Sequence, residues 1–232
     1  MAIEFIDSAF AGSAVATTNP SITHELTVQT ADVLIALLSN SSISVNGDYT
    51  SDSNLFSLTY NWNQGSTTIG QGFVFARIVT DAGSEPAAYA WTCGVAYAYS
   101  LHVFQFRGVH SDIWDVTPAA GTTTVGTTGG AGAITAPSID IVTSGAMGLL
   151  MATVVSSSAA LSSPTNSYGD LIVYTSGRCQ GMARRASLST GATGTSAMTM
   201  NAADDYAICQ AALKAAADPP PGFTGLRVTR HI

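Results

Sequence analysis

Short apolar runs rich in Val, Ile, Thr, Tyr and Phe recur along the chain, separated by clusters of Gly, Asn, Ser and Pro. This pattern is typical of strands in a sandwich or barrel, and it predicts an all-β protein. The expected strands are Ile3–Ile6, Ile22–Val28, Val33–Leu38, Phe56–Trp62, Thr68–Val79, Ala88–Phe106, Ile139–Val142, Leu149–Val155, Leu171–Thr175 and Tyr206–Leu213. The run Val33–Leu38 is apolar throughout, so we expect both of its faces to be covered.

Two segments depart from this pattern. Ala202–Ala217 is rich in alanine, the best helix former, but its centre, Tyr206–Leu213, can equally form a final strand, which we favour. Gly121–Ala133 consists of Gly, Thr and Ala apart from Val125, with almost no large side chain. Such low-complexity sequence predicts a long surface loop, so we expect a Gly/Thr-rich crossover over residues 119–133.

The two sides of that crossover resemble each other. Ile22–Ser42 and Ile134–Ser158 both read as a strand, a turn of small residues, an apolar strand and a serine cluster. Chance similarity among strands of simple composition is an equally open explanation. A true repeat, with halves over residues 1–118 and 134–217, fits the two interleaved Greek keys of a jelly roll. We therefore expect a single jelly-roll-like β-sandwich domain over residues 1–217.

The last fifteen residues, 218–232, form a separate segment. Three prolines stiffen its start, and apolar and basic residues then alternate up to the end. Such a peptide can add as a strand to a partner's sheet edge, whereas a frayed chain end is the alternative. We predict an extended C-terminal docking arm. Its docking residues are Pro219, Pro220, Pro221, Phe223, Leu226, Arg227, Val228, Arg230, His231 and Ile232.

Charge is scarce: only 10% of residues are charged, against roughly 25% in ordinary soluble domains. Lys214 is the sole lysine, and the formal net charge is −7. Ser, Thr, Gly and Ala occupy positions where a freely diffusing protein carries Lys and Glu, which suits close packing within an assembly. The acidic balance argues against nucleic acid as a partner, because phosphate binding needs clustered Lys and Arg.

Neither a membrane segment nor a signal peptide is expected. The longest apolar run, Gly145–Val155, falls short of the roughly 20 residues of a spanning helix. Residues 1–7 lack the basic and apolar regions of a signal peptide. Three cysteines far apart, without a CxxC, indicate buried thiols in a reducing compartment. We expect synthesis in a cytoplasm and no membrane partner.

Gly177–Gly181 reads GxCxG, the spacing of a nucleophile elbow, which sits between a strand and a helix. Leu171–Thr175 would supply the strand, but Met182–Gly194 is a poor helix, and the alternation of strands and helices is missing along the chain. A structural thiol at Cys179 is the more ordinary interpretation. We predict no catalytic residues, no cofactor and no metal.

Two polar clusters could bind ligands. A turn with Asp-Asn spacing could donate oxygens to Ca²⁺, although such sequences are more often plain turns. A second cluster could hold a small ligand, although an Arg–Asp pair that pins a corner is the commoner arrangement. The first comprises Asp48, Asp52 and Asn54, and the second comprises Arg107, His110, Asp112 and Asp115 around Trp114.

Aromatic residues at strand spacing could stack on sugar rings, but they more often fill a core. A small basic cluster is a possible contact spot for an acidic neighbouring subunit. The aromatic residues are Trp62, Trp91, Trp114, Tyr49 and Tyr60, and the contact spot is Arg178, Arg184 and Arg185.

A resemblance to a known family rests on four short motifs. They are Phe5-Ile-Asp-Ser-Ala-Phe-Ala-Gly12, Ala31-Asp-Val-Leu-Ile-Ala-Leu-Leu38, Phe104-Gln-Phe-Arg-Gly-Val109 and Ala212-Leu-Lys-Ala215. Over roughly residues 3–217 the chain resembles β-sandwich domains encoded by tailed bacteriophages and related bacterial surface proteins. It departs from that pattern at Ala31, where the family usually has Gly, and at Ala216, where the family has Pro.

The resemblance implies a non-enzymatic virion component made in the bacterial host cytoplasm. The leading expectation is a capsid decoration, or cement, protein that bridges and stabilises shell subunits. Its partners would be the major capsid protein or another virion subunit, and a homo-oligomer is expected. The alternative is a tail, fibre or carbohydrate-binding β-sandwich module that recognises host surface glycans.

Overall fold

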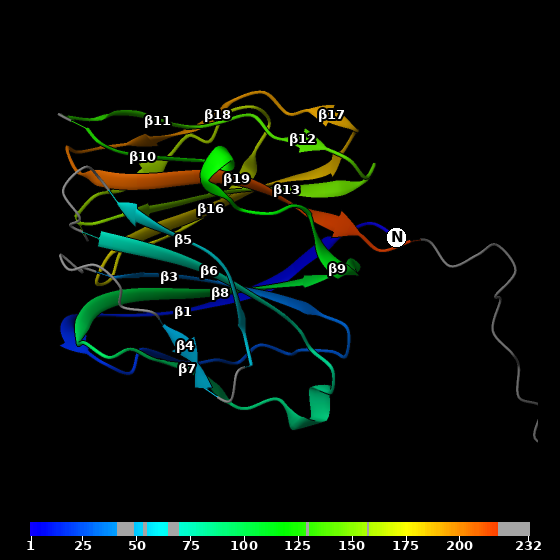
Figure 1. Cartoon of the computed structure of the whole chain (residues 1–232), viewed down its shortest axis with the longest axis horizontal. Coiled ribbons are helices and arrows are strands. Elements are labelled where there is room, and N and C mark those ends of the chain that lie inside the picture. The colour runs from blue at the N-terminus through cyan, green and yellow to red at the C-terminus, as the bar shows by residue number, and fades with distance from the viewer. Residues whose placement is uncertain (41–48, 53–54, 65–69, 129, 157, 218–232) are drawn as a thin grey trace, which may run out of the picture.

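The computed structural model describes residues 1–40, 49–52, 55–64, 70–128, 130–156 and 158–217 (Figure 1). Over these residues the fold is all-β, as predicted, with 3-10 turns at Ala82–Ser84 and Ala120–Thr122. The predicted arm, residues 218–232, lies outside the described residues.

Each half of the chain builds one large and one small antiparallel sheet. The first half comprises β1 (Glu4–Thr17), β2 (Ser21–Thr23), β3 (Val33–Asn40), β4 (Thr50–Ser51), β5 (Ser57–Gln64), β6 (Gly70–Ile78), β7 (Ala88–Thr92) and β8 (Tyr97–Arg107). Its large sheet has the order β1-β8-β3-β6-β5, and its small sheet has the order β2-β7-β4.

The second half repeats this arrangement. It comprises β9 (Val109–Val116), β10 (Thr123–Thr127), β11 (Gly132–Ala136), β12 (Asp140–Ile141), β13 (Ala146–Val154), β14 (Leu161–Ser162), β15 (Gly169–Tyr174), β16 (Cys179–Leu188), β17 (Gly191–Ala192), β18 (Ser196–Met200) and β19 (Asp205–Ala215). Its large sheet runs β10-β19-β13-β16-β15, with β9 also paired to β19, and its small sheet runs β11-β18-β14. The pair β12-β17 has no counterpart among the described strands of the first half.

The repeat extends to the register of individual residues. Val33 on β3 lies opposite Phe106, and Met147 on β13 lies opposite Leu213; both pairings continue in step for eight residues. An irregularity of register interrupts the edge pair β5–β6 and recurs in β15–β16. Agreement at this level shows that the two halves share one arrangement of strands. The two copies nevertheless lie side by side and do not interleave, contrary to the expectation of one interleaved sandwich.

The four sheets stack as layers, with the two large sheets in the middle and the small sheets outside (Figure 1). One apolar cluster fills the first half between its large and small sheets, with Trp91 and Phe73 at its centre. A second fills the other half around Met198 and Ile208. A third cluster joins the facing large sheets and includes Phe104 from the first half. We call this contact between the two large sheets the seam.

Polar side chains cross the seam at equivalent positions. From β5, the Trp62 Nε1 donates to Thr153 Oγ1 at 3.1 Å. From β16, Gln180 Nε2 donates to Ser39 Oγ at 3.0 Å. The strand register makes Ser39 the counterpart of Thr153, and Gly72 the counterpart of Gln180. The halves therefore touch through matching surfaces, as the subunits of a two-fold dimer do.

Gly72 has no side chain because Trp62 covers it. A Cβ at this position would overlap the Trp62 indole, which lies across the Gly72 backbone on its way to the seam. In the second half the neighbouring strand carries Tyr174 in place of Trp62, and Gln180 has room for its amide.

Several sequence expectations need correction. The strand expected at Ile22–Val28 covers only Ser21–Thr23, and the long strand expected at Ala88–Phe106 is divided into β7 and β8. Gly121–Ala133 is not one loop, since it contains β10 and the start of β11. These strands pair by backbone hydrogen bonds to β19 and β18, which requires no large side chains. The ambiguous alanine-rich segment is a strand, β19, as favoured.

Candidate functional site

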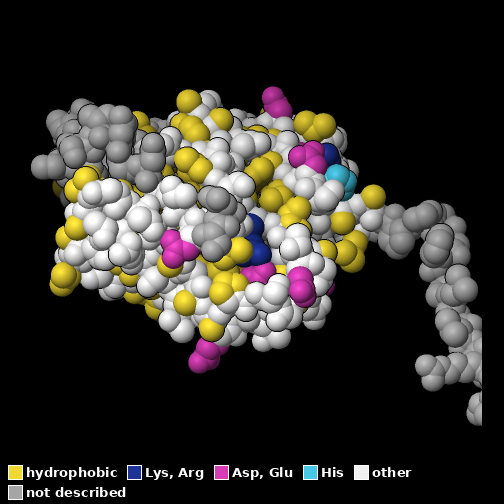
Figure 2. Space-filling model, turned by 60° about the horizontal axis from the view of Figure 1, so that its bottom comes forward, with side chains coloured by type: hydrophobic (Ala, Val, Ile, Leu, Met, Phe, Trp, Pro, Cys, Tyr) yellow, Lys and Arg dark blue, Asp and Glu magenta, His cyan; other side chains and the backbone are white. Residues whose placement is uncertain are grey.

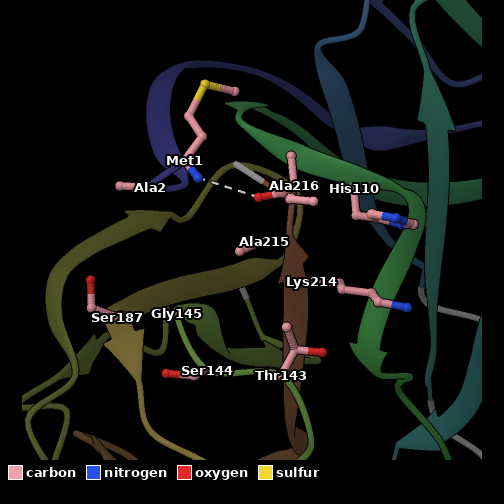
Figure 3. A pocket seen from close by; sticks show the side chains of 11 residues that line it. Met1, Ala2, His110, Thr143, Ser144, Gly145, Ser187, Lys214, Ala215 and Ala216 are labelled. Atoms are coloured by element: carbon pink, nitrogen blue, oxygen red, sulfur yellow. Dashed lines mark hydrogen bonds between the residues drawn. The ribbon is translucent and has the colours of Figure 1, made fainter. Parts of the chain in front are cut away.

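A groove runs along one end of the seam, beside the first strand of the chain. Its first part is a hollow of about 560 Å³ lined by the start of the chain, the loop before β13, residues of β9 and β16, and the end of β19 (Figure 3). Met1, Gly145 and Ser187 lie on its walls, and His110 and Lys214 lie at one side. The Met1 amine donates to the Ala216 carbonyl at 3.3 Å, so the start of the chain and the end of β19 meet at this point.

The second part continues the groove towards β1. It is lined by Glu4, Phe5, Met147, Asp170, Arg184 and Ala186. The two parts adjoin, because residues next to each other in the sequence line both of them. We call the two together the seam groove. Its second part has an apolar floor, formed by Phe5 and the buried Met147, and two exposed carboxylates at the rim.

Arg184 links the two halves inside this groove. Its guanidinium lies 3.8 Å from the centre of the Phe5 ring, a cation–π contact, and 3.2 Å from Asp170 Oδ2. Burial lowers the pKa of Arg184, and the nearby Asp170 opposes this shift. Arg184 is therefore engaged by its own chain, while Glu4 leaves an acidic rim.

Sequence reasoning missed this groove because its residues come from β1, β13, β15 and β16, which no local motif connects. The one signal available was the charge distribution. Residues 1–217 contain all but one of the fifteen acidic residues and all but two of the eight basic ones. The two remaining arginines lie in the predicted arm, which makes the arm basic and the rest of the chain acidic.

Cys179, the centre of the GxCxG motif, is a structural thiol. It is fully buried on β16 in the core of the second half. Burial raises its pKa to about 12, so the thiolate needed for nucleophilic attack does not form near neutral pH. The other two cysteines are also free and buried, as expected from the sequence.

The proposed calcium turn is only partly described, because Asp48 and Asn54 lie outside the described residues. Asp52 accepts a hydrogen bond from Thr92 Oγ1 at 3.1 Å. Among the residues that the structure describes, no group of three or more His, Cys, Asp or Glu side chains could hold a metal ion.

The polar corner from Arg107 to Asp115 is not a ligand site in this structure, since its members make separate contacts. Arg107 pairs with the buried Asp32, through Nε at 2.8 Å, and not with Asp112 or Asp115. Asp112 pairs with Lys214 at 2.9 Å. Asp115 accepts from the backbone of Val142 and Thr143, and His110 Nδ1 accepts from the backbone of Asp112.

The aromatic residues do not form an exposed platform. Trp91 is fully buried and Tyr49 almost so, both in the core of the first half, and Trp62 is almost fully buried in the seam. Tyr60 and Trp114 are partly buried and pack against the seam. The commoner interpretation, that aromatics at strand spacing fill a core, holds for these positions.

The three arginines of the predicted contact spot point to different places. Arg178 donates from its guanidinium to the Val155 carbonyl. Arg184 lies in the seam groove against Phe5, whereas Arg185 follows it on the strand and points to the other face, where it contacts Asn166 at 3.4 Å. The structure therefore does not bring these three side chains together.

No family model, no curated protein and no solved structure matches the chain. In the part of the chain that the structure describes, no helix is long and apolar enough to cross a membrane.

Proposed function

We propose that this protein is a structural component of a tailed-bacteriophage virion, a capsid decoration (cement) protein that bridges and stabilises shell subunits. The observation that carries this proposal is the double stack of sheets. In the first half β1 pairs with β8, β2 with β7 and β3 with β6, and in the second half β10 pairs with β19, β11 with β18 and β13 with β16. Nested antiparallel pairing of this kind supports a jelly-roll-like arrangement, which viral capsid domains use.

The outer faces support a role in an assembly. On the small sheets the side chains that point outwards are Ser, Thr and Ala, among them Ser21, Thr23, Ala88, Thr135 and Ser162, all exposed. In Figure 2 few side chains are charged, and most of the described surface in this view is uncharged. Such faces repel neighbours weakly and lose little hydration of charge when they are covered. A rigid body with two faces of this kind, on opposite sides, can contact two neighbours at once.

The arm supplies a second attachment in this proposal. Deletion of Pro219–Ile232 is expected to leave a folded body that no longer occupies the particle. A full-length chain with the order of residues 222–232 shuffled, which keeps length and charge, is the matched control for the arm sequence. Imaging of purified particles by electron microscopy locates the chain, and circular dichroism verifies that each variant is folded. Undiminished occupancy by the truncated chain would contradict the role of the arm.

The same images test the assignment as a whole. A density for the double stack on the capsid surface is the expected result. A location at the tail tip, together with binding to host glycans, would instead support the carbohydrate-binding alternative. Absence of the chain from particles would contradict a virion role altogether.

A further inference from the structure

The chain leaves the described body at the rim of the seam groove. Ala216 is held on both sides, because its carbonyl accepts from the Met1 amine at 3.3 Å and its backbone N–H donates to the Gly108 carbonyl at 2.9 Å. Ala217, the last described residue, lines the first hollow. The segment 218–232 therefore starts at one end of this groove.

We propose that the second part of the seam groove binds residues 226–232 of a second copy of this chain. The inference rests on the proposed function for the docking role of the arm. It deepens that proposal by naming the surface that receives the arm.

Charge complementarity favours this occupant. The groove carries Glu4 and Asp170 at its rim, whereas the segment carries Arg227 and Arg230. Since the rest of the chain carries a net negative charge, the basic arm is the part of one copy that an acidic neighbour attracts.

The apolar contacts match as well. In an extended peptide alternate side chains face opposite ways, which places Leu226 and Val228 on one face and Arg227 on the other. The apolar face can cover Phe5 and Met147 on the floor, while the arginine reaches the carboxylates at the rim. Arg184 does not compete for the incoming peptide, because Asp170 and the Phe5 ring already hold it.

The position of the groove favours a second copy over the arm's own body. Arg227 lies about ten residues past Ala217, a reach of up to ~33 Å when extended. Met147 of the second part pairs with Leu213, so β19 has already passed this part of the groove when the chain reaches Ala217. A chain that fills its own groove must therefore double back, although the three consecutive prolines after Ala217 favour an extended path. Each copy would give one arm and accept another, a head-to-tail contact that produces a ring or a filament.

The test measures self-association of the full-length protein by analytical ultracentrifugation over a range of concentrations. We expect concentration-dependent oligomers that weaken as salt rises. The variants Glu4→Lys and Asp170→Asn are each expected to raise the dissociation constant about tenfold. Asparagine is chosen because Asp170 has φ of 49°, a conformation that asparagine also tolerates. Glu25→Lys, at an exposed site outside the groove, is the matched control and should associate normally.

A charge exchange gives the decisive result. Arg227→Glu with Arg230→Glu should abolish association, and Glu4→Lys in the same chain should restore part of it. Oligomers that respond equally to Glu25→Lys and Glu4→Lys would overturn the inference. A protein that stays monomeric at all concentrations would also overturn it. This includes a monomer whose arm is protected from trypsin because it occupies the groove of its own body. A monomer that still occupies the virion would overturn this inference and leave the proposed function standing.

Discussion

The two halves close the same seam with different side chains. In the first half a tryptophan from the edge strand reaches over Gly72 to Thr153. In the second half the strand next to the edge provides Gln180, whose amide reaches Ser39 and two backbone carbonyls. The backbone frame is thus repeated closely while the chemistry at equivalent points is not. A fold of this kind is specified by register and by which positions face inwards, more than by residue identity.

The two halves also differ at the residue that follows the matched pairings of β3 with β8 and of β13 with β19. Arg107 at the end of β8 and Lys214 near the end of β19 are counterparts. Arg107 binds Asp32, which is almost fully buried and also accepts from Gln105 Nε2 at 2.6 Å. Lys214 binds the exposed Asp112. The same strand position therefore carries an inner ion pair in one half and a surface pair in the other.

The largest expected effect comes from breaking the polar contact of the second half. Gln180→Ala removes an amide whose two N–H groups lie within hydrogen-bond distance of three acceptors at Leu37, Ser39 and Ser100, and it opens a cavity in the seam. We expect the free energy of unfolding to fall by about 3–4 kcal/mol, as measured by urea denaturation.

Trp62→Phe is the matched change in the first half. It removes one hydrogen bond and keeps most of the ring, so the loss should be about 1 kcal/mol. Equal losses for the two variants would contradict the view that the halves close the seam unequally.

The ion pairs should differ in the same way. Asp32→Asn leaves Arg107 without its carboxylate partner and should lower the free energy of unfolding by about 2–3 kcal/mol. In the folded protein burial raises the pKa of Asp32, but hydrogen bonds from Arg107, the Gln29 backbone and Gln105 outweigh it, and the net pKa is lowered. The stability that this carboxylate contributes is therefore present above its unfolded pKa and is lost as the pH falls through its folded pKa.

Asp112→Asn is the control for the surface pair. Because Asp112 is exposed, solvent screens its attraction to Lys214, and we expect no measurable change in thermal midpoint. A loss as large as that of Asp32→Asn would remove the contrast between the two positions.

The smallest expected effect at neutral pH, and one that grows in acid, concerns His102. It faces the seam beside Phe10, Phe104 and Tyr174, and its counterpart in the second half is Cys209. Neither ring nitrogen has a hydrogen-bond partner among the described residues, and burial lowers the pKa of His102 to about 3.

A folded-state pKa below the unfolded value of 6.5 means that His102 stabilises the fold fully only above pH 6.5. As the pH falls from 6.5 towards 3, the imidazole of His102 is protonated in the unfolded chain but stays neutral in the folded protein. This difference lowers the free energy of unfolding by about 2 kcal/mol at pH 5. The variant His102→Leu should lack this part of the acid dependence. Parallel unfolding curves of the variant and the original protein between pH 7 and pH 5 would contradict the assignment.

Much of the fold follows from local sequence. The alternation of apolar runs with turn residues predicts an all-β chain, and the fully apolar Val33–Leu38 is indeed covered on both faces, by the first core and by the seam. The weak strands β10 and β11 escaped prediction because their Gly and Thr residues carry no apolar pattern. Their pairing is dictated by the free edges of neighbouring strands.

The seam groove and the ion pairs were harder to predict from the sequence. Arg107 has acidic neighbours in sequence, but its partner is Asp32, which a strand pairing brings beside it. The relation between the halves was visible only as a short similarity around Ile22 and Ile134, because register, and not residue identity, is what the halves share. Contacts between residues distant in sequence depend on this register and cannot be obtained from local patterns.

The covalent link between the halves has a thermodynamic consequence. Two separate chains with these matching faces would have to meet by diffusion, and each substitution would occur on both sides of their interface. Here β8 runs on into β9, so the large sheets meet at an effective concentration set by a short connection. The seam can then be held by contacts too weak to join two free chains. Equivalent positions on its two sides can also carry different residues, as Gly72 and Gln180 do.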